Sequence, residues 1–308
     1  MTTEMTTIDT NNYDAMAKSM GMAVSTGETK KKDSSTLPRF RLHHQPIMGE
    51  AEVKGKKKKV EVLEGGSYKL ENPNGITTYS PTANIRVFMQ RFMYKRFIPN
   101  TSPKEGESRG TYHKTVMADS LNIDLKDNNG TFNCGKPAGY IADFKALPDH
   151  MQDLIKQIKR VRVLFGEVTL TEPYDEAGES LGDDITSPFI WEIDNRDAFK
   201  TLGIPLNKMG SMKRLPLQHY IGLTSTEQPL PNGSSFWLPN ANLDMSKSIE
   251  IEDGDHERFA DFIAWVTNYN EYIMSQWELS VGQEDVPADT AHIINDIVGT
   301  LDIEAAVN

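Results

Sequence analysis

One stretch, residues 84–99, constrains the fold more than any other part of the chain: N-I-R-V-F-M-Q-R-F-M-Y-K-R-F-I-P. Successive side chains of a β-strand point to opposite faces, and β-branched and aromatic residues favour strands. With this period of two, one face carries Arg86, Phe88, Gln90, Phe92, Tyr94 and Arg96, and the other carries Ile85, Val87, Met89, Arg91, Met93, Lys95 and Phe97. The stretch therefore predicts one long strand, around which the chain builds a sheet.

The mixture of rings and cations on the first face has two interpretations. Flat aromatic surfaces beside guanidinium groups are what a single-stranded nucleic acid requires, because bases stack on rings and phosphates bind cations. Alternatively, Phe88, Phe92 and Tyr94 belong to the core and the cations lie at strand ends, since large aromatic side chains are usually buried. The rest of the chain bears on this choice.

The charge distribution favours the nucleic-acid interpretation, although the net charge of −11 at first argues against it. Residues 30–114 contain 18 Lys and Arg against 8 Asp and Glu, whereas residues 259–308 contain nine Asp and Glu and no Lys or Arg. A basic segment joined to an acidic end is typical of proteins that contact nucleic acid and carry an acidic tail.

Composition and motifs exclude several classes. A single cysteine, Cys134, excludes an intrachain disulfide and fits a reducing compartment, so we expect a cytoplasmic protein, in the host cytoplasm if it is viral. No apolar run is long enough to span a membrane and no signal pattern opens the chain, so we expect no membrane contact. Walker A, G-x-S-x-G and metal-ligand spacings are missing from the sequence, and we expect no enzymatic activity, no cofactor and no metal.

Periodicity predicts several short strands, a helix, and then more strands. We expect strands at 39–42, on both sides of a basic loop at 54–59, at 111–117 and at 161–170, a helix at 149–159, a hairpin joined across 229–233, and an amphipathic helix capped by Asp255. The apolar residues of the last helix are spaced by three and four: Phe259, Phe262, Ile263, Val266, Tyr269, Ile273 and Trp277.

This order predicts a mainly β fold with helices, as an OB-like Greek-key barrel with long insertions, in which a helix lies between the third and fourth strands. A single β-sandwich is the alternative. We expect a disordered N-terminal arm at 1–36, the barrel core at 37–253, an amphipathic helix packed on it at 254–281, and an acidic flexible tail at 282–308.

The layout resembles the single-stranded DNA-binding proteins of bacteriophages. The resemblance is carried by R-V-F-M-Q-R-F-M-Y-K-R-F at 86–97, by L-I-K-Q-I-K-R-V-R-V-L-F-G-E-V at 154–168, and by the Lys-free C-terminus. It implies an OB fold, protection of single strands in DNA replication and recombination, and contacts of the acidic tail with replication proteins. The tail departs from the family because Ile, Val and Ala dilute its acids and no aromatic residue ends it, which puts tail-mediated recruitment in doubt.

We therefore predict sequence-neutral binding of single-stranded DNA through a basic and aromatic groove. The residues expected to contact DNA are Arg39, Arg41, Lys56, Lys57, Lys58, Lys59, Arg86, Phe88, Arg91, Phe92, Tyr94, Lys95, Arg96, Tyr112, Lys114, Arg160 and Arg162. The alternative is a virion or assembly protein whose β-rich body self-associates, and a weaker option is an enzyme accessory to recombination. The sequence leaves the oligomeric state and the preference between DNA and RNA open.

Overall fold

A computed structural model describes residues 37–53, 56–73, 75–103, 108–137, 140–231 and 233–282. The chain divides into two units, Met1–Ser35 and Thr36–Asn308, and only the second contains described residues. The predicted arm at 1–36 and nearly all of the predicted tail at 282–308 lie outside them, as does Lys54.

The described residues form one group of strands before the helix at Asp149–Gln157 and a second group after it, in the order that the sequence predicts. The elements are β1 (Arg39–Leu42), β2 (Ile47–Val53), β3 (Lys56–Leu63), β4 (Tyr68–Glu71), β5 (Thr78–Ser80), β6 (Thr82–Pro99), β7 (Gly110–Lys114), η1 (Asn133–Gly135), α2 (Asp149–Gln157), β8 (Lys159–Thr171), β9 (Ile185–Ile193), α3 (Arg196–Ser211), η2 (Pro216–Gln218), β10 (Ile221–Pro229), β11 (Ser235–Leu243) and α4 (Asp253–Gly282). The predicted long strand is confirmed as β6, with 18 residues. The predicted loop at 54–59 is wrong for its last four lysines, which lie in β3.

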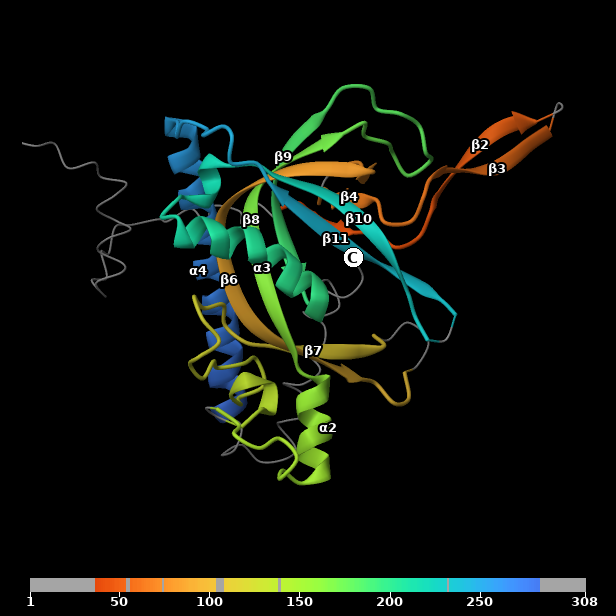
Figure 1. The fold of residues 1–308 in the computed structure, drawn as a ribbon. Coiled ribbons are helices and arrows are strands. Elements are labelled where there is room, and N and C mark those ends of the chain that lie inside the picture. Colours follow the sequence, from red (N-terminus) through yellow and green to blue (C-terminus); the bar gives the residue numbers. More distant parts are fainter. Residues whose placement is uncertain are drawn as a thin grey trace, which may run out of the picture. The chain divides into compact units, whose positions relative to one another are not determined.

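Nine strands form one mixed sheet in the order β11-β10-β6-β8-β9-β1-β4-β5, and β7 pairs with the far end of β6. The contact between β1 and β9 is parallel, and the other ladders are antiparallel. Strands β2 and β3 form a separate two-stranded ribbon that extends away from the large sheet (Figure 1).

The mainly β class is confirmed, whereas closure into an OB-like barrel is not, because no ladder joins β11 to β5 within the described residues. The sheet nevertheless curves. Tyr68 Oη of β4 donates a hydrogen bond of 2.7 Å to Thr224 O of β10, and the Trp237 N–H of β11 donates one of 3.2 Å to His44 Nδ1. These side-chain contacts tie the two ends of the sheet without pairing their backbones.

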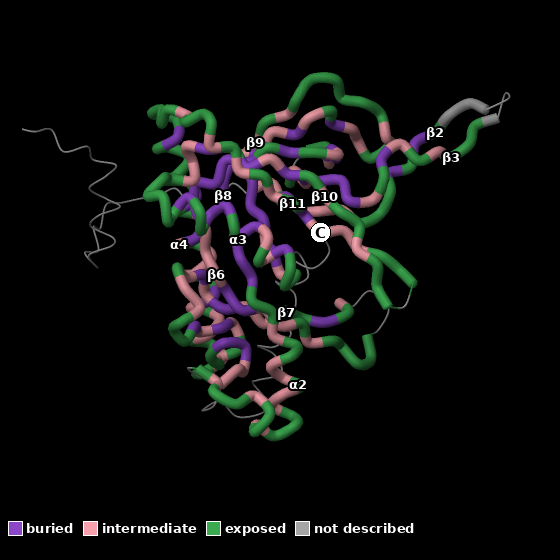
Figure 2. The backbone as a smooth tube through the Cα atoms, in the orientation of Figure 1, coloured by how far each residue is buried: buried purple, intermediate pink, exposed green. Residues whose placement is uncertain are grey.

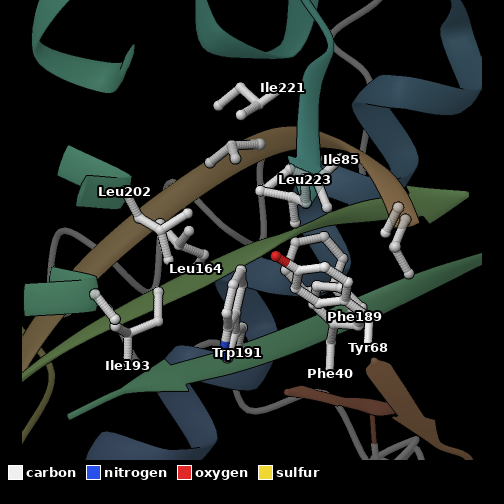
Figure 3. Packing of buried hydrophobic residues seen from close by; sticks show 14 of the residues in the cluster. Phe40, Tyr68, Ile85, Leu164, Phe189, Trp191, Ile193, Leu202, Ile221 and Leu223 are labelled. Atoms are coloured by element: carbon white, nitrogen blue, oxygen red, sulfur yellow. The ribbon is translucent and has the colours of Figure 1, made fainter. Parts of the chain in front are cut away.

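Two core clusters lie on opposite faces of the paired strands β6 and β8. The first packs α3, through Leu202, Leu206 and Met209, against the inner side of the curved sheet (Figure 3). The second packs α4, through Phe262 and Val266, against the other face. Because both faces are covered, the backbone of β6 and β8 is buried along much of its length (Figure 2).

A β-bulge in β6 changes the predicted assignment of faces. Val87 belongs to the first core cluster, while its neighbours Phe88 and Met89 both belong to the second. The register with β8 shifts between Val87 and Met89 at the same point. An extra residue in one strand reverses the facing of all that follow. The predicted single face from Arg86 to Arg96 is therefore two half-faces on opposite sides of the sheet.

Helix α4 matches the predicted helix at 254–281 to within one residue at each end, but Asp255 lies inside its first turn, where it is buried, and is not the cap. Phe262, Val266 and Ile273 of the predicted apolar face are buried, but Phe259 is 39% exposed and Ile263 44%. In the part of the chain that the structure describes, no helix combines the length and the hydropathy needed to cross a membrane.

Candidate nucleic-acid interface

Two residues predicted to contact DNA, Arg86 and Phe88, are structural. Arg86 lies 2.9 Å from Asp255 and 3.8 Å from Glu167, and its Nε donates to the Leu217 carbonyl. Phe88 is 7% exposed and packs edge-on against Phe262. Removing a ring of this size from a core costs about 1.5–3 kcal/mol. Stacking on a base would contribute about the same free energy, so moving Phe88 out of the core to stack on a base brings no net stabilisation.

The Arg86–Asp255 pair also docks α4. Burial alone would raise the pKa of Asp255, but the hydrogen bond from Arg86 and the charges of Arg86 and Arg258 outweigh burial and hold that pKa below its usual value. Arg258 of the same helix reaches Glu167 of β8 at 2.5 Å. The N-terminal turn of α4 is thus fixed to β6 and β8 by charge pairs.

Tyr94 and Arg91, also predicted to contact DNA, contact other residues of the protein instead. Tyr94 is 4% exposed and packs with Leu125 and Cys134, so its ring cannot receive a base. Cys134 is a buried free thiol, and burial raises its pKa. Arg91 pairs with Asp119 at 2.8 Å and lines a pocket of about 380 Å³ beside α4.

Beyond the core, on the α4 side of β6 and β8, three lysines form ion pairs with two carboxylates. We call this group the compensated cluster: Lys95, Lys114, Lys159, Glu192 and Asp194. Lys95 and Lys114 lie 3.3 and 3.7 Å from Glu192, and Lys159 lies 3.1 Å from Asp194. Burial opposes the charge of Glu192, but Lys114 and Lys95 hold its pKa below the usual value. Each of these cations already has a carboxylate.

An exposed aromatic pair borders the compensated cluster. The rings of Phe97 and Tyr112 lie 5.0 Å apart on neighbouring positions of β6 and β7. The Lys95 and Lys114 ammonium groups lie 4.8 and 5.8 Å from the Tyr112 ring centre. The predicted base contact Tyr112 is therefore accessible, at 42% exposed.

The α3 side of the same strands carries cations and rings without carboxylate partners among the described residues, and we call this group the uncompensated surface. It comprises Phe92, Arg96, Lys136, Arg160, Arg162 and Phe199. The register places Tyr94 opposite Arg160 and Phe92 opposite Arg162 on this face. Within the described residues, no carboxylate lies within 4 Å of its four cations.

Amide oxygens and rings replace carboxylates as the partners of these cations. Arg96 donates from Nε and Nη2 to Gln157 Oε1, both at 3.2 Å. Lys136 lies 5.4 Å from the Tyr94 ring centre, and Arg160 lies 5.9 Å from that of Phe199. Such neutral partners orient a cation without cancelling its charge.

Arg162 is the most deeply placed of the four, at 6% exposed. It donates to Gln90 Oε1 at 2.5 Å, and its guanidinium lies 5.1 Å from the Phe92 ring centre and 4.5 Å from that of Phe199. Its buried Nε has no hydrogen-bond partner in the described structure. Burial lowers the pKa of Arg162, and no carboxylate opposes that shift.

The other predicted contacts lie away from this surface. Arg41 of β1 pairs with Glu71, and Arg39 is exposed near Glu192. The β2–β3 ribbon carries the exposed Lys57, Lys58 and Lys59, of which Lys57 pairs with Glu50 at 3.1 Å. The side chain of Lys56 lies outside the described set. The ribbon extends away from β6 and β8 (Figure 1), so the structure does not merge all predicted cations into one groove.

Sequence reasoning missed Phe199 and Lys136, which come from α3 and from the residue after η1. The segment around Phe199 does carry Arg196 and Lys200, but nothing local shows that α3 packs against β8. The available signal was the Asn195 cap, whose side chain accepts from two backbone N–H groups and starts α3 at a fixed point. That start places Phe199 in the first turns of the helix, on the side that packs against β8.

Among the residues with a described placement, no group of three His, Cys, Asp or Glu side chains lies close enough to share a metal ion. Comparison of the chain with protein-family models, with curated proteins and with solved structures finds no match. Its candidate function therefore rests on the geometry of these two faces.

Proposed function

We propose that this protein binds single-stranded DNA without sequence preference, through the uncompensated surface on the α3 side of β6 and β8. The observation that carries the proposal is the partner set of Arg96, Lys136, Arg160 and Arg162, which are held by amides and rings rather than by carboxylates. A phosphate that approaches Arg96, Lys136 or Arg160, which are at least partly exposed, displaces small counterions and breaks no internal ion pair.

The half-buried rings of Phe92 and Phe199 support a single strand over a duplex. Unpaired bases expose their faces and stack on aromatic side chains, whereas duplex bases are already stacked. Helices α2 and α4 offer no basic face for the major groove, since their charged residues are mostly acidic. Helix α3 exposes Arg196, Lys200 and Lys208, so the duplex control below also tests binding through that helix. By its resemblance to the phage proteins, the role would be protection of single strands in replication and recombination.

We further propose that the curved sheet is an opened relative of the OB barrel. Support comes from the hydrogen bonds of Tyr68 and Trp237, which tie β4 and β11 to the opposite end of the sheet. The helix α2 directly before β8 also matches the expected place of the OB helix.

The test is a fluorescence-anisotropy titration of labelled oligo-dT at several salt concentrations, with a duplex of the same length as control. We expect tight single-strand binding, weak duplex binding, and a slope of log K against log salt of about −0.7 per phosphate contacted. Equal or absent binding of the two probes would contradict the proposal.

Self-association into an assembly is a second candidate, favoured by the exposed apolar side chains of α4. Phe259, Ile263 and Leu279 are 39%, 44% and 50% exposed on one long helix. Size-exclusion chromatography without DNA tests it, because an assembly protein should elute as an oligomer, and Ile263→Glu should return it to a monomer. A monomer at all concentrations would remove this candidate.

A further inference from the structure

Arg162 presents a contradiction if it is taken as a phosphate contact. It is 6% exposed, so a phosphate cannot reach it without displacing its neighbours. Its charge also has no carboxylate within 4 Å in the described structure, and a buried cation without a counter-charge destabilises the fold. Its closest partners are Gln90 and the rings of Phe92 and Phe199.

The backbone of α3 makes room for this guanidinium. A Cβ atom at Gly203 would lie 2.6 Å from Arg162 Nη2, so a side chain at that position would displace the guanidinium. Gly203 does not have positive φ, so its small size rather than its conformational freedom is what the site uses. Arg162 therefore lies between β6 and α3, with its guanidinium directly against the backbone at Gly203.

The two rings that Arg162 contacts come from different elements. Phe92 lies on β6 and Phe199 on α3, with ring centres 6.0 Å apart and planes at 46°. Both are partly exposed, in contrast to the buried Phe88 and Tyr94. The guanidinium lies 4.5 Å from the centre of Phe199, where its charge favours one orientation of the ring.

We propose that Phe199 is a nucleobase-stacking residue of the single-strand site, and that Arg162 is the positioning residue that holds Phe199 and Phe92 in place. This inference rests on the proposed function and deepens it. Arg160 lies 5.9 Å from the same ring, which places a phosphate-binding cation beside the base platform. Base and backbone contacts then come from neighbouring residues of one surface.

The experiment compares two labelled probes of equal length, oligo-dT and an abasic oligonucleotide that keeps the phosphates and lacks the bases. Phe199→Leu keeps an apolar side chain for the core and removes the ring. We expect it to weaken oligo-dT binding about tenfold and to leave abasic binding unchanged. Phe236→Leu, a partly buried ring on the edge strand β11, is the matched control and should change neither.

Arg162→Lys tests the positioning role, since it keeps the charge and loses the planar guanidinium. We expect the same selective loss on oligo-dT, and a salt slope that equals that of the wild type. Arg160→Gln should instead weaken both probes and lower the slope. Binding is referred to the folded fraction of each variant, measured by thermal unfolding.

The outcomes separate the inference from the function beneath it. A selective loss on oligo-dT for both Phe199→Leu and Arg162→Lys supports the inference. Equal losses on the two probes, or no loss, would overturn it and leave Phe199 as a core residue. If the wild type binds both probes equally, single-strand binding stands and base stacking fails. If it binds neither, the proposed function fails.

Discussion

Lys159 and Arg160 are neighbours in β8, carry the same charge and are both exposed, yet they face different chemical surroundings. Lys159 lies on the α4 side and pairs with Asp194 at 3.1 Å. Arg160 lies on the α3 side and has the Phe199 ring as its partner. The same contrast holds along β6, where Arg86 and Lys95 have carboxylates while Arg96 has an amide.

The difference teaches that the number of cations does not define a binding surface. A cation that already has a carboxylate gains little from a phosphate, because one ion pair replaces another and the freed acid repels the ligand. A cation held by a ring or an amide keeps its full charge for an incoming anion. The α4 side therefore uses charge to hold the fold, and we expect the α3 side to use it for binding.

The largest expected effect is on stability, at the buried pair of the α4 side. Asp255→Ala leaves the Arg86 guanidinium buried without its main counter-charge, so we expect a loss of about 3–5 kcal/mol in the free energy of unfolding. Urea denaturation measures it. Asp261→Ala, an exposed acid of the same helix, is the control and should change little. Equal stability of the two variants would mean that Arg86 is not held by Asp255.

The next effect is on DNA binding, at the uncompensated surface. Replacement of Arg96 and Arg160 together by Gln should remove two phosphate contacts and reduce the salt slope by about 1.4. The matched variant replaces Lys114 and Lys159 by Gln, with the same change in net charge. Salt-dependent anisotropy should show a much smaller change in slope for it. A larger effect from the lysine pair would reverse the comparison.

A third variant should convert one side into the other. Glu192→Gln removes the carboxylate shared by Lys95 and Lys114. Lys95 keeps Asp194 at 3.8 Å, whereas Lys114 is left with the Tyr112 ring. We expect single-strand affinity to rise a few-fold and the salt slope to steepen. Glu179→Gln, an exposed acid in the loop before β9, controls for net charge. Equal gains from both variants would show that only total charge matters.

The smallest expected effect is a loss of stability in acid, caused by protonation of Asp255 on the α4 side. The pKa of Asp255 is lowered in the folded protein, so its contribution to stability is complete above the usual carboxyl range near pH 4 and is lost as pH falls through the lowered pKa. Thermal unfolding from pH 6 to pH 3 measures this loss. Asp255→Asn should show a shallower decline over the same range, and an identical decline would contradict this account of the pair.

The sequence predicts the strands well because their signals are local. The alternation at 39–42, 84–99 and 161–170 corresponds to β1, β6 and β8, and the Pro148 boundary precedes α2. The bulge at Phe88 is not visible in this pattern, since Val87, Phe88 and Met89 are all apolar and can face either core cluster. This extra residue determines which side chains share a face, and it places Arg86 and Phe88 on the opposite side of the sheet from Phe92.

The candidate site was only partly predictable because its partners are distant in sequence. Arg96, Arg160 and Arg162 are visible as cations beside rings, but nothing local shows that Glu192 and Asp194 will pair with Lys95 and Lys159. Phe199 reaches the site from α3, more than 100 residues after Phe92. Curvature of the sheet without closure depends likewise on contacts between its ends, such as Tyr68 with Thr224.

The most direct measurement is photo-crosslinking of the wild-type chain to an oligonucleotide that contains 5-bromodeoxyuridine, followed by peptide mapping. If the α3 side binds the strand, crosslinks should appear at Phe92 and Phe199, which are its two partly exposed rings. Crosslinks confined to Phe97 and Tyr112 beside the compensated cluster, or to the β2–β3 ribbon, would contradict the central claim.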